Sequence, residues 1–253
     1  MDMTIIEINS ISLIWSIVAL VVFFFLLYVT APYGRHFKKG WGPELPNRVG
    51  WIIMEAPSLL LMLFLVLTGS NNNNYFALIL CLFWTVHYGN RTFVFPFRIH
   101  TKGKKMPLTI VLSAVFFNGI NAGLNGYWIG NLASFEDGHV FGWNVLLGVG
   151  LFLFGFLLNN YCDTILIKLR KEGEKGYKIP FGGPFSLVSC PNFLGELLEW
   201  LGFALMAWSL PALSFFLWTF ANLIPRSLSH HKWYRKQFPN YPQSRKAIFP
   251  YLI

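Results

Sequence analysis

Long apolar runs alternate with short polar segments along most of the chain. Runs near residues 10–31, 48–69, 75–96, 107–130 and 142–167 have the length of about 20 residues that a helix needs to cross a bilayer. Another apolar region follows Pro191 and continues to about residue 225, divided by the segment "SLPA". Pro211 is expected in the first turn of a new helix there, because proline is tolerated at that position and disrupts a helix interior. The pattern predicts an all-α integral membrane protein with seven transmembrane helices in one domain, residues 1–253.

Polar side chains recur at helical spacing inside five of these runs. In the region after Pro191, Asn192, Glu196 and Glu199 are spaced so that they lie within roughly 60° of one another on a helix. Interhelical hydrogen bonding explains any single stripe, but charged groups in spans usually face a protein interior or a wet cavity. Five stripes together favour a shared polar cavity. The other four contain Glu55 with Pro57; His87, Tyr88 and Arg91; Asn118, Asn121 and Asn125; and Asn159, Asp163 and Arg170.

All 20 Lys and Arg residues fall on one predicted side of the membrane. Because Lys and Arg accumulate in cytoplasmic loops, the N-terminus is expected outside or in a lumen and the C-terminus in the cytoplasm. The net charge of +9 is then a one-sided basic face suited to anionic lipid headgroups. Nucleic acid is not an expected partner, since these charges are spread over loops tied to the membrane. The basic groups are Arg35, Lys38, Lys39 and Arg48; Arg91, Arg98, Lys102, Lys104 and Lys105; Lys168, Arg170, Lys171, Lys175 and Lys178; and Arg226, Lys232, Arg235, Lys236, Arg245 and Lys246.

The composition agrees with a membrane protein and restricts the chemistry. The chain is 55% hydrophobic and 12% charged, unlike a soluble domain. The first run lacks a preceding basic segment and a small-residue cleavage pattern, so we expect a retained helix rather than a signal peptide. The three cysteines, Cys81, Cys162 and Cys190, are odd in number and show no C-x-x-C spacing, so no disulfide framework or metal site is expected.

Carboxylates and Asn residues beside a collar of Arg and Lys suit a ligand that carries hydroxyl or amide groups and phosphates. A nucleotide cofactor has this mixture. The segment "GVGLFLFG", Gly148 to Gly155, has the wrong glycine spacing for a Rossmann domain and follows no predicted strand. A nucleotide would therefore bind in the helical bundle itself. The Gly- and Pro-rich loop from Glu172 to Asn192 is either a lid over that cofactor or an ordinary connector.

Four segments together resemble the steroid 5α-reductase family. They are "HYGNRTFVFPF", "YKIPFGGPFSLVS", "NFLGELLEWLGFALMAWSLPA" and "HHKWYRKQFPNYPQSRKAIFP". The resemblance runs from about residue 50 to the C-terminus, and weakly through "APYGRH" at residues 31–36. The tail alone is less specific, because sterol reductases of the lamin-B-receptor type and isoprenylcysteine methyltransferases end similarly. The short chain favours a bacterial 5α-reductase-like enzyme.

The resemblance implies NADPH-dependent reduction of the C4=C5 double bond of 3-oxo-Δ4 steroids, or of a related lipophilic enone, by hydride transfer. By resemblance, Glu55 and Tyr88 hold the substrate ketone. Met54 stands where vertebrate members carry Gln before the catalytic Glu, which leaves the substrate open. Glu199 has either a functional or a structural role. The implied cofactor residues are Tyr33, Arg91, Asn159, Asp163, Arg170, Lys178, Asn192, Glu196, Arg226, His230 and Tyr234.

The expected chemistry requires stabilisation of negative charge on the ketone oxygen during hydride addition. Tyr88 can donate one hydrogen bond to that oxygen, and Glu55 can donate a second if it stays protonated. Apolar walls would admit a flat lipophilic substrate from the bilayer and exclude water. We expect a monomer in the bacterial inner membrane, or in the endoplasmic reticulum if the chain is eukaryotic.

Three other classes remain as alternatives to a steroid 5α-reductase. A sterol C=C reductase of the lamin-B-receptor type shares the ending of the chain. A membrane methyltransferase that uses S-adenosylmethionine would need no phosphate collar. A transporter would use the carboxylates for ion coupling, but internal repeats or mid-span breaks are typical of transporters, and the sequence has no convincing repeat.

Overall fold

The computed structural model describes residues 3–31, 34–36, 40–101, 103–135, 139–169, 174 and 176–253. Helices dominate this part of the chain, which confirms the all-α prediction apart from two three-residue strands, β1 (Glu44–Pro46) and β2 (Lys105–Pro107). The α-helices are α1 (Ile5–Tyr28), α2 (Asn47–Thr68), α3 (Tyr75–Gly89), α4 (Phe95–Arg98), α5 (Leu108–Tyr127), α6 (Trp143–Lys168), α7 (Pro191–Ala207) and α8 (Leu210–Gln237). Shorter turns are the π-helical η2 (Asn90–Val94) and η3 (Trp128–Leu132), and the 3-10 turns η1 (Gly34–His36), η4 (His139–Phe141) and η5 (Gly183–Ser186).

Four helical segments of the described chain are long and apolar enough to cross a membrane. They are α1, α2, α6 and the continuous segment Leu108–Leu132 formed by α5 and η3. The other predicted runs also contain helices, but α3 and α7 have only 15 and 17 residues, and α8 ends in a polar, basic segment. The membrane-protein prediction is thus supported by four spans, and seven crossings stay a prediction.

Local sequence explains where several helices begin. Thr4 and Glu7 form a capping box at the start of α1, which satisfies backbone N–H groups that have no partner within the helix. The Asn74 side chain caps α3, and the Ser209 side chain caps α8. Pro211 lies in the first turn of α8, as predicted from the segment "SLPA".

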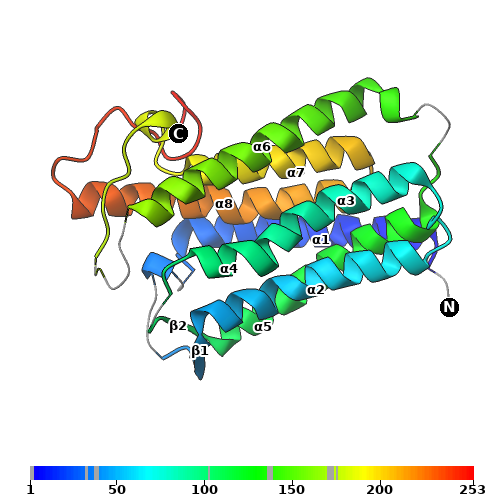
Figure 1. The fold of residues 1–253 in the computed structure, drawn as a ribbon, viewed down its shortest axis with the longest axis horizontal. Helices are drawn as coiled ribbons and strands as arrows, with labels where there is room; N and C mark the ends of the chain where they lie inside the picture. Colours follow the sequence, from blue (N-terminus) through cyan, green and yellow to red (C-terminus); the bar gives the residue numbers. More distant parts are fainter. Residues whose placement is uncertain are drawn as a thin grey trace.

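The long helices lie side by side along the length of the molecule (Figure 1). α6 packs along α7, α2 along α5, and α1 along α8. The β1–β2 pair and the C-terminal tail lie at the same end of the bundle, opposite the N-terminus (Figure 1). β1 is antiparallel to β2, with Pro46 opposite Lys105 and Glu44 opposite Pro107. Each strand leads directly into a helix, so this pairing sets α2 and α5 to begin beside each other.

The bundle core is rich in aromatic side chains. Trp84 of α3 and Trp200 of α7 are fully buried, with ring centroids 5.1 Å apart. Phe215 of α8 packs against both, at 4.9 and 4.5 Å. Such aromatic contacts add to the stabilisation from burial alone. They fix α3, α7 and α8 around a common apolar layer.

Glycines allow the backbones of α6 and α7 to touch. A Cβ atom on Gly155 of α6 would lie 2.4 Å from both the Glu199 nitrogen and the Gly195 oxygen of α7. One on Gly202 would lie 2.5 Å from the Gly148 oxygen. Small residues permit this close approach of membrane helices. The seam formed by Gly148, Gly155, Gly195 and Gly202 therefore sets the distance between α6 and α7.

The seam predicts that Gly155→Ala destabilises the protein, because the added methyl group collides with backbone that cannot rotate away. Overpacking of this kind costs about 1–3 kcal/mol. The matched control is Gly150→Ala on the same helix, where a Cβ would meet nothing within 4 Å. Thermal unfolding in detergent should show a lower midpoint for Gly155→Ala and a parent-like or higher midpoint for Gly150→Ala. Equal midpoints for the two variants would contradict the seam.

Candidate functional site

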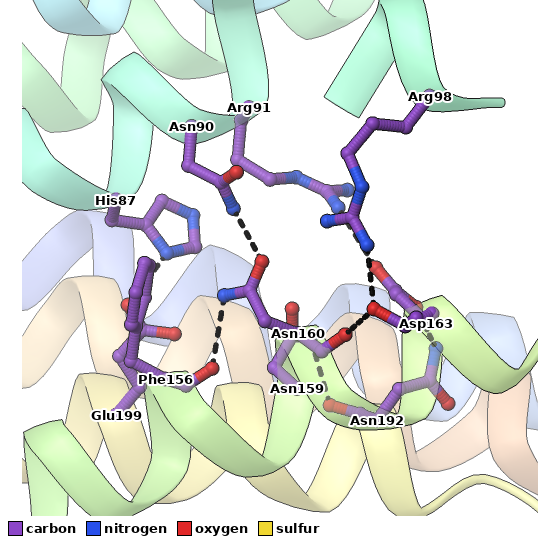
Figure 2. A network of polar contacts seen from close by, with 11 residues as sticks. His87, Asn90, Arg91, Arg98, Phe156, Asn159, Asn160, Asp163, Asn192 and Glu199 are labelled. Atoms are coloured by element: carbon purple, nitrogen blue, oxygen red, sulfur yellow. Dashed lines mark hydrogen bonds and ion pairs between the residues drawn. The ribbon is translucent and has the colours of Figure 1, made fainter. Parts of the chain in front are cut away.

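Glu199 of α7 forms a buried hydrogen bond with α3. Its Oε1 lies 2.7 Å from Nδ1 of His87, and Glu199 is 0% exposed (Figure 2). The second carboxyl oxygen, Oε2, is buried and has no hydrogen-bond partner among the described residues. Burial of a carboxyl group is costly unless it is hydrogen-bonded, and His87 supplies such a bond to Oε1. Glu199 therefore joins α7 to α3, and a role for it in the reaction stays a prediction.

Asp163 of α6 is the centre of a second set of contacts. Its Oδ2 lies 3.6 Å from an Arg91 guanidinium nitrogen, and its Oδ1 accepts a hydrogen bond from Asn192 of α7 at 3.1 Å (Figure 2). Asn159 donates from its side chain to the Asn192 carbonyl oxygen at 2.9 Å. These four predicted cofactor residues, from three separate chain segments, therefore form one connected group.

Arg91 supplies positive charge to several buried or partly buried carboxylates. Besides Asp163, it interacts electrostatically with Glu55, Glu196 and Glu199. The flat guanidinium group also lies over the rings of Trp51 and Phe95, with its carbon 4.9 and 4.4 Å from the ring centroids. Arginine stacks on aromatic faces while keeping its charge. One cation on η2 therefore compensates the negative charge of carboxylates from α2, α6 and α7.

Glu55 of α2 and Tyr88 of α3 lie close enough to interact electrostatically. Asn118 of α5 donates from its side-chain nitrogen to the Met54 carbonyl oxygen at 2.7 Å, and the same nitrogen lies 3.5 Å from Glu55 Oε2. The Met54 side chain packs in an apolar cluster with Met106. Asn118 therefore places an amide beside Glu55, and the side chain at position 54 contributes only apolar packing.

The rest of the α5 Asn stripe joins helices. Asn121 Oδ1 accepts a hydrogen bond from the Trp15 indole at 3.2 Å. Asn125 donates to the Pro211 carbonyl oxygen at 3.2 Å. The three Asn residues are therefore divided between the site and the contacts of α5 with α1 and α8.

A second cluster surrounds the C-terminal half of α8. His230 is 8% exposed, stacks on His36 at 5.3 Å between ring centroids, and lies 5.5 Å from the Phe193 ring. Burial lowers the pKa of His230 well below its usual value, and the positive charges of Arg35 and Arg226 act in the same direction. His230 is therefore neutral at physiological pH.

Arg35 belongs to this second cluster, although the sequence pattern did not single it out. Its guanidinium carbon lies 4.5 Å from the Tyr234 ring centroid, 5.1 Å from Trp233 and 5.3 Å from Tyr177. Arg35 also donates a hydrogen bond to the Tyr234 hydroxyl at 3.3 Å. Burial raises the pKa of Tyr234, although the nearby Arg35 charge opposes this rise. Its sequence signals are its place among the basic residues of one predicted membrane side and its position in "APYGRH", just after a predicted span.

The first turn of α7 connects the two clusters. Asn192 contacts Asp163 in the first cluster, and its neighbour Phe193 packs on His230 in the second. The C-terminal tail supports this turn, because the Cys190 nitrogen donates to the Ala247 oxygen at 3.0 Å and the Ser189 nitrogen donates to the Lys246 oxygen at 2.8 Å. The clusters therefore form a continuous strip from the bundle interior to its C-terminal end.

The predicted site residues are mostly found in this strip. Arg226, His230 and Tyr234 follow one another along α8 at four-residue spacing. Lys178 is exposed and pairs with Glu174 at 2.6 Å, and no described contact connects it to the strip. Tyr33 and Arg170 lie outside the described residues. In the described part of the chain, no group of three or more His, Cys, Asp or Glu residues is placed to hold a metal ion.

An apolar helical bundle that encloses a largely buried strip of carboxylates, amides and cationic side chains is typical of a membrane protein with an internal polar binding site. Residues 104–253 match the family model described as 3-oxo-5-alpha-steroid 4-dehydrogenase. The chain is 41% identical over 242 residues to the steroid 5-alpha-reductase DET2 of Solanum lycopersicum, covering 93% of each chain. It is 40% identical over 238 residues to 3-oxo-5-alpha-steroid 4-dehydrogenase 1 of Bos taurus, covering 92% of each chain.

A further relative is 3-oxo-5-alpha-steroid 4-dehydrogenase 2 of Homo sapiens, which is 39% identical over 237 residues, covering 90% of this chain and 91% of the relative. The chain belongs to the 3-oxo-5-alpha-steroid 4-dehydrogenase family and is a membrane oxidoreductase. The resemblance found in the sequence is thereby confirmed. The family match also favours a reductase over a methyltransferase or a transporter.

The depressed pKa of His230 predicts a loss of stability in acid. The folded protein keeps His230 neutral, whereas in the unfolded chain the residue takes up a proton near its ordinary pKa of about 6.5. The stability that it contributes is complete above that pH and declines as the pH falls toward the folded pKa, by at most about 1.4 kcal/mol per pH unit for one proton.

Thermal midpoints measured in detergent between pH 7.5 and 5 should therefore fall less for His230→Gln than for the parent protein. His100→Gln is the matched control, since His100 is exposed, and it should keep the parent slope. A His230→Gln slope equal to the parent slope would refute this role of His230.

Proposed function

We propose that this protein uses NADPH to reduce the C4=C5 double bond of 3-oxo-Δ4 steroids or of a related lipophilic enone. The observation that carries the proposal is the continuous strip through the first turn of α7. Its inner part is rich in carboxylates and amides, and its outer part is basic and aromatic. The names of the relatives, steroid 5-alpha-reductase and 3-oxo-5-alpha-steroid 4-dehydrogenase, support the same reaction.

The outer cluster has the chemistry to bind phosphates. A nitrogen of Arg35 and Nε2 of His230 are buried and have no hydrogen-bond partner among the described residues. Buried polar atoms without partners are costly, and phosphate oxygens would satisfy them through charge-assisted hydrogen bonds. Arg226 adds a further cation on the same helix. These features fit the phosphate groups of a dinucleotide.

The inner cluster has the chemistry to bind the other end of such a cofactor. Asn192, Asp163 and Glu196 offer amide and carboxylate groups that suit a carboxamide and ribose hydroxyls. NADPH supplies a hydride when it is bound. By resemblance, Tyr33, Arg91, Asn159, Arg170 and Lys178 would complete the cofactor site, and the loop from Glu172 to Asn192 would act as a lid.

Tyr88 and Glu55 would polarise the substrate ketone. Tyr88 is 3% exposed and packs on Trp84 at 5.1 Å between ring centroids, so its ring and hydroxyl oxygen have a fixed position. Glu55 would donate the second hydrogen bond in its protonated form, with Asn118 holding its carboxyl group. Donors that are already positioned stabilise the growing negative charge on the ketone oxygen without further reorganisation.

The proposed enzyme is a monomeric multi-pass protein with seven spans, an outer or luminal N-terminus and a cytoplasmic C-terminus. The segregation of Lys and Arg supports this orientation. The wide apolar surfaces of α1 and α6, with Ile14 61% and Leu157 65% exposed, suit lipid and the entry of a lipophilic substrate from the bilayer.

A reporter fused after Ile253 should be cytoplasmic, and a tag within residues 71–74 should be accessible only from the opposite side. Finding both on one side would refute this topology.

Tyr88→Phe is predicted to reduce turnover while NADPH binding is retained. The variant keeps the packed ring and removes one hydroxyl donor, and the loss of an oxyanion donor typically costs about 10²–10³ in turnover. The measurement is NADPH oxidation by purified protein with a Δ4-3-ketosteroid, together with NADPH fluorescence titration. Tyr127→Phe is the control, because the Tyr127 hydroxyl contacts Met3 at the other end of the bundle.

Glu55 variants separate two roles of the same side chain in that assay. Partial activity in Glu55→Gln with near-complete loss in Glu55→Ala would support hydrogen-bond donation, because an amide can donate but cannot supply an acidic proton. Loss in both variants would favour a role that needs the acid. Parent-like rates in both Tyr88→Phe and Glu55→Ala would refute the proposed ketone site. Binding of S-adenosylmethionine instead of NADPH would refute the reductase proposal itself.

A further inference from the structure

The helix that carries Arg91 changes its hydrogen-bond pattern at this residue. α3 ends at Gly89 and continues as the π-helical turn η2, in which the Phe95 nitrogen donates to the Asn90 carbonyl oxygen five residues earlier. π-Helical turns are rare and occur often at functional sites. A widened turn rotates the following side chains relative to a regular helix. The direction of Arg91 therefore depends on how η2 is held.

The contacts of Arg91 itself hold it loosely. Its nitrogen lies 3.6 Å from Asp163 Oδ2, which is an ion-pair distance and too long for a hydrogen bond. It also stacks on the Trp51 and Phe95 rings and interacts electrostatically with Glu55, Glu196 and Glu199. None of these interactions fixes the direction of the guanidinium in the way that a short bidentate bond would. Other contacts must therefore hold the backbone that carries Arg91.

Two hydrogen bonds attach the chain on both sides of Arg91 to α6. Asn90 donates to Asn160 Oδ1 at 2.9 Å, and Arg98 donates to Thr164 Oγ1 at 2.5 Å (Figure 2). Asn160 and Thr164 are one helical turn apart on α6, and the Thr164 hydroxyl donates to the Asn160 carbonyl oxygen at 2.7 Å. We call Asn90, Arg98, Asn160 and Thr164 the α6 clamp.

The Asn90–Asn160 pair is itself oriented by a further bond. Asn160 uses its side-chain nitrogen to donate to the Phe156 carbonyl oxygen at 2.9 Å (Figure 2). Its oxygen is thereby directed toward Asn90. Both side chains are neutral, so they join η2 to α6 without adding charge among the carboxylates. A charged residue at either position would compete for Arg91 or repel it.

We propose that the α6 clamp positions Arg91 for the reductase reaction, with Asn90 and Asn160 as positioning residues that act through Arg91. This inference rests on the proposed function. The clamp fixes η2 so that one guanidinium remains within reach of Asp163, Glu55 and Glu196. Without it, η2 could revert to regular helix and carry Arg91 to another direction.

The test uses Asn160→Leu and Asn90→Leu, which break the same bond from opposite sides in the full-length protein. Each should lower kcat for NADPH oxidation with a Δ4-3-ketosteroid by about 10- to 100-fold, since small misplacements near a reacting centre have effects of this size. The thermal midpoint in detergent should change little. Asn160→Gln keeps an amide and should recover part of the lost rate, which a general loss of packing would not explain.

A double-mutant cycle with Arg91→Lys identifies the route of the effect. If Asn160 acts through Arg91, Asn160→Leu should lower kcat by less than about threefold in the Arg91→Lys background. Asn144→Leu is the matched control, because Asn144 also joins α6 to another helix, donating to the Leu205 carbonyl oxygen of α7 at 3.0 Å. It should leave kcat near the parent value in both backgrounds.

Parent-like kcat in Asn160→Leu and Asn90→Leu would overturn the proposal. It would also be overturned if Asn160→Leu lowered kcat by the same factor in the Arg91→Lys background as in the parent protein. A parent protein that is inactive with NADPH and every enone tested would instead refute the proposed function. The same double-mutant cycle is then measured on NADPH affinity. The proposal still predicts that the losses of affinity in Asn160→Leu and Arg91→Lys are non-additive, and additive losses would overturn it.

Discussion

The structure depends on the charge compensation of carboxylates that lie buried or partly buried inside an apolar bundle. Arg91 interacts with Asp163, Glu55, Glu196 and Glu199, which come from three different helices. Isolated charges in such surroundings are very costly, and removal of one partner leaves the others uncompensated. The packing of α2, α6 and α7 around η2 therefore brings acidic groups close to Arg91, which compensates their negative charge. A ligand that binds there meets a site whose charges are already arranged.

The glycine seam makes this arrangement geometrically possible. At Gly155 and Gly195 the backbones of α6 and α7 touch, and the atoms in contact include those of Asn159 and Glu199. The close approach places Asn192 within hydrogen-bond distance of Asp163. A larger separation of the two helices would break this bond and the Asn159 bond to the Asn192 carbonyl oxygen. Residues without functional groups thus determine the spacing of the functional ones.

Sequence periodicity predicted the helices and the polar stripes because both depend on local spacing. The start of α8 at Pro211 followed from the restrictions on proline. The partners of the stripes could not be predicted in this way, because His87 and Glu199 are 112 residues apart. The π-helical turn at Arg91 and the aromatic contacts of Arg35 also depend on tertiary packing. The assignment of Glu55, Tyr88 and the cofactor residues came from family resemblance, and the structure adds the proximity of those that it describes, apart from Lys178.

We infer that the acidic cluster around Arg91 and the basic, aromatic cluster around Arg35 form one cofactor site. A cryo-electron microscopy structure of the detergent-solubilised protein with NADP⁺ tests this most directly. Nicotinamide density is expected beside Asn192 and Glu196, and phosphate density beside Arg35, Arg226 and His230. Cofactor density elsewhere, with both clusters closed by protein contacts alone, would contradict a shared cofactor site.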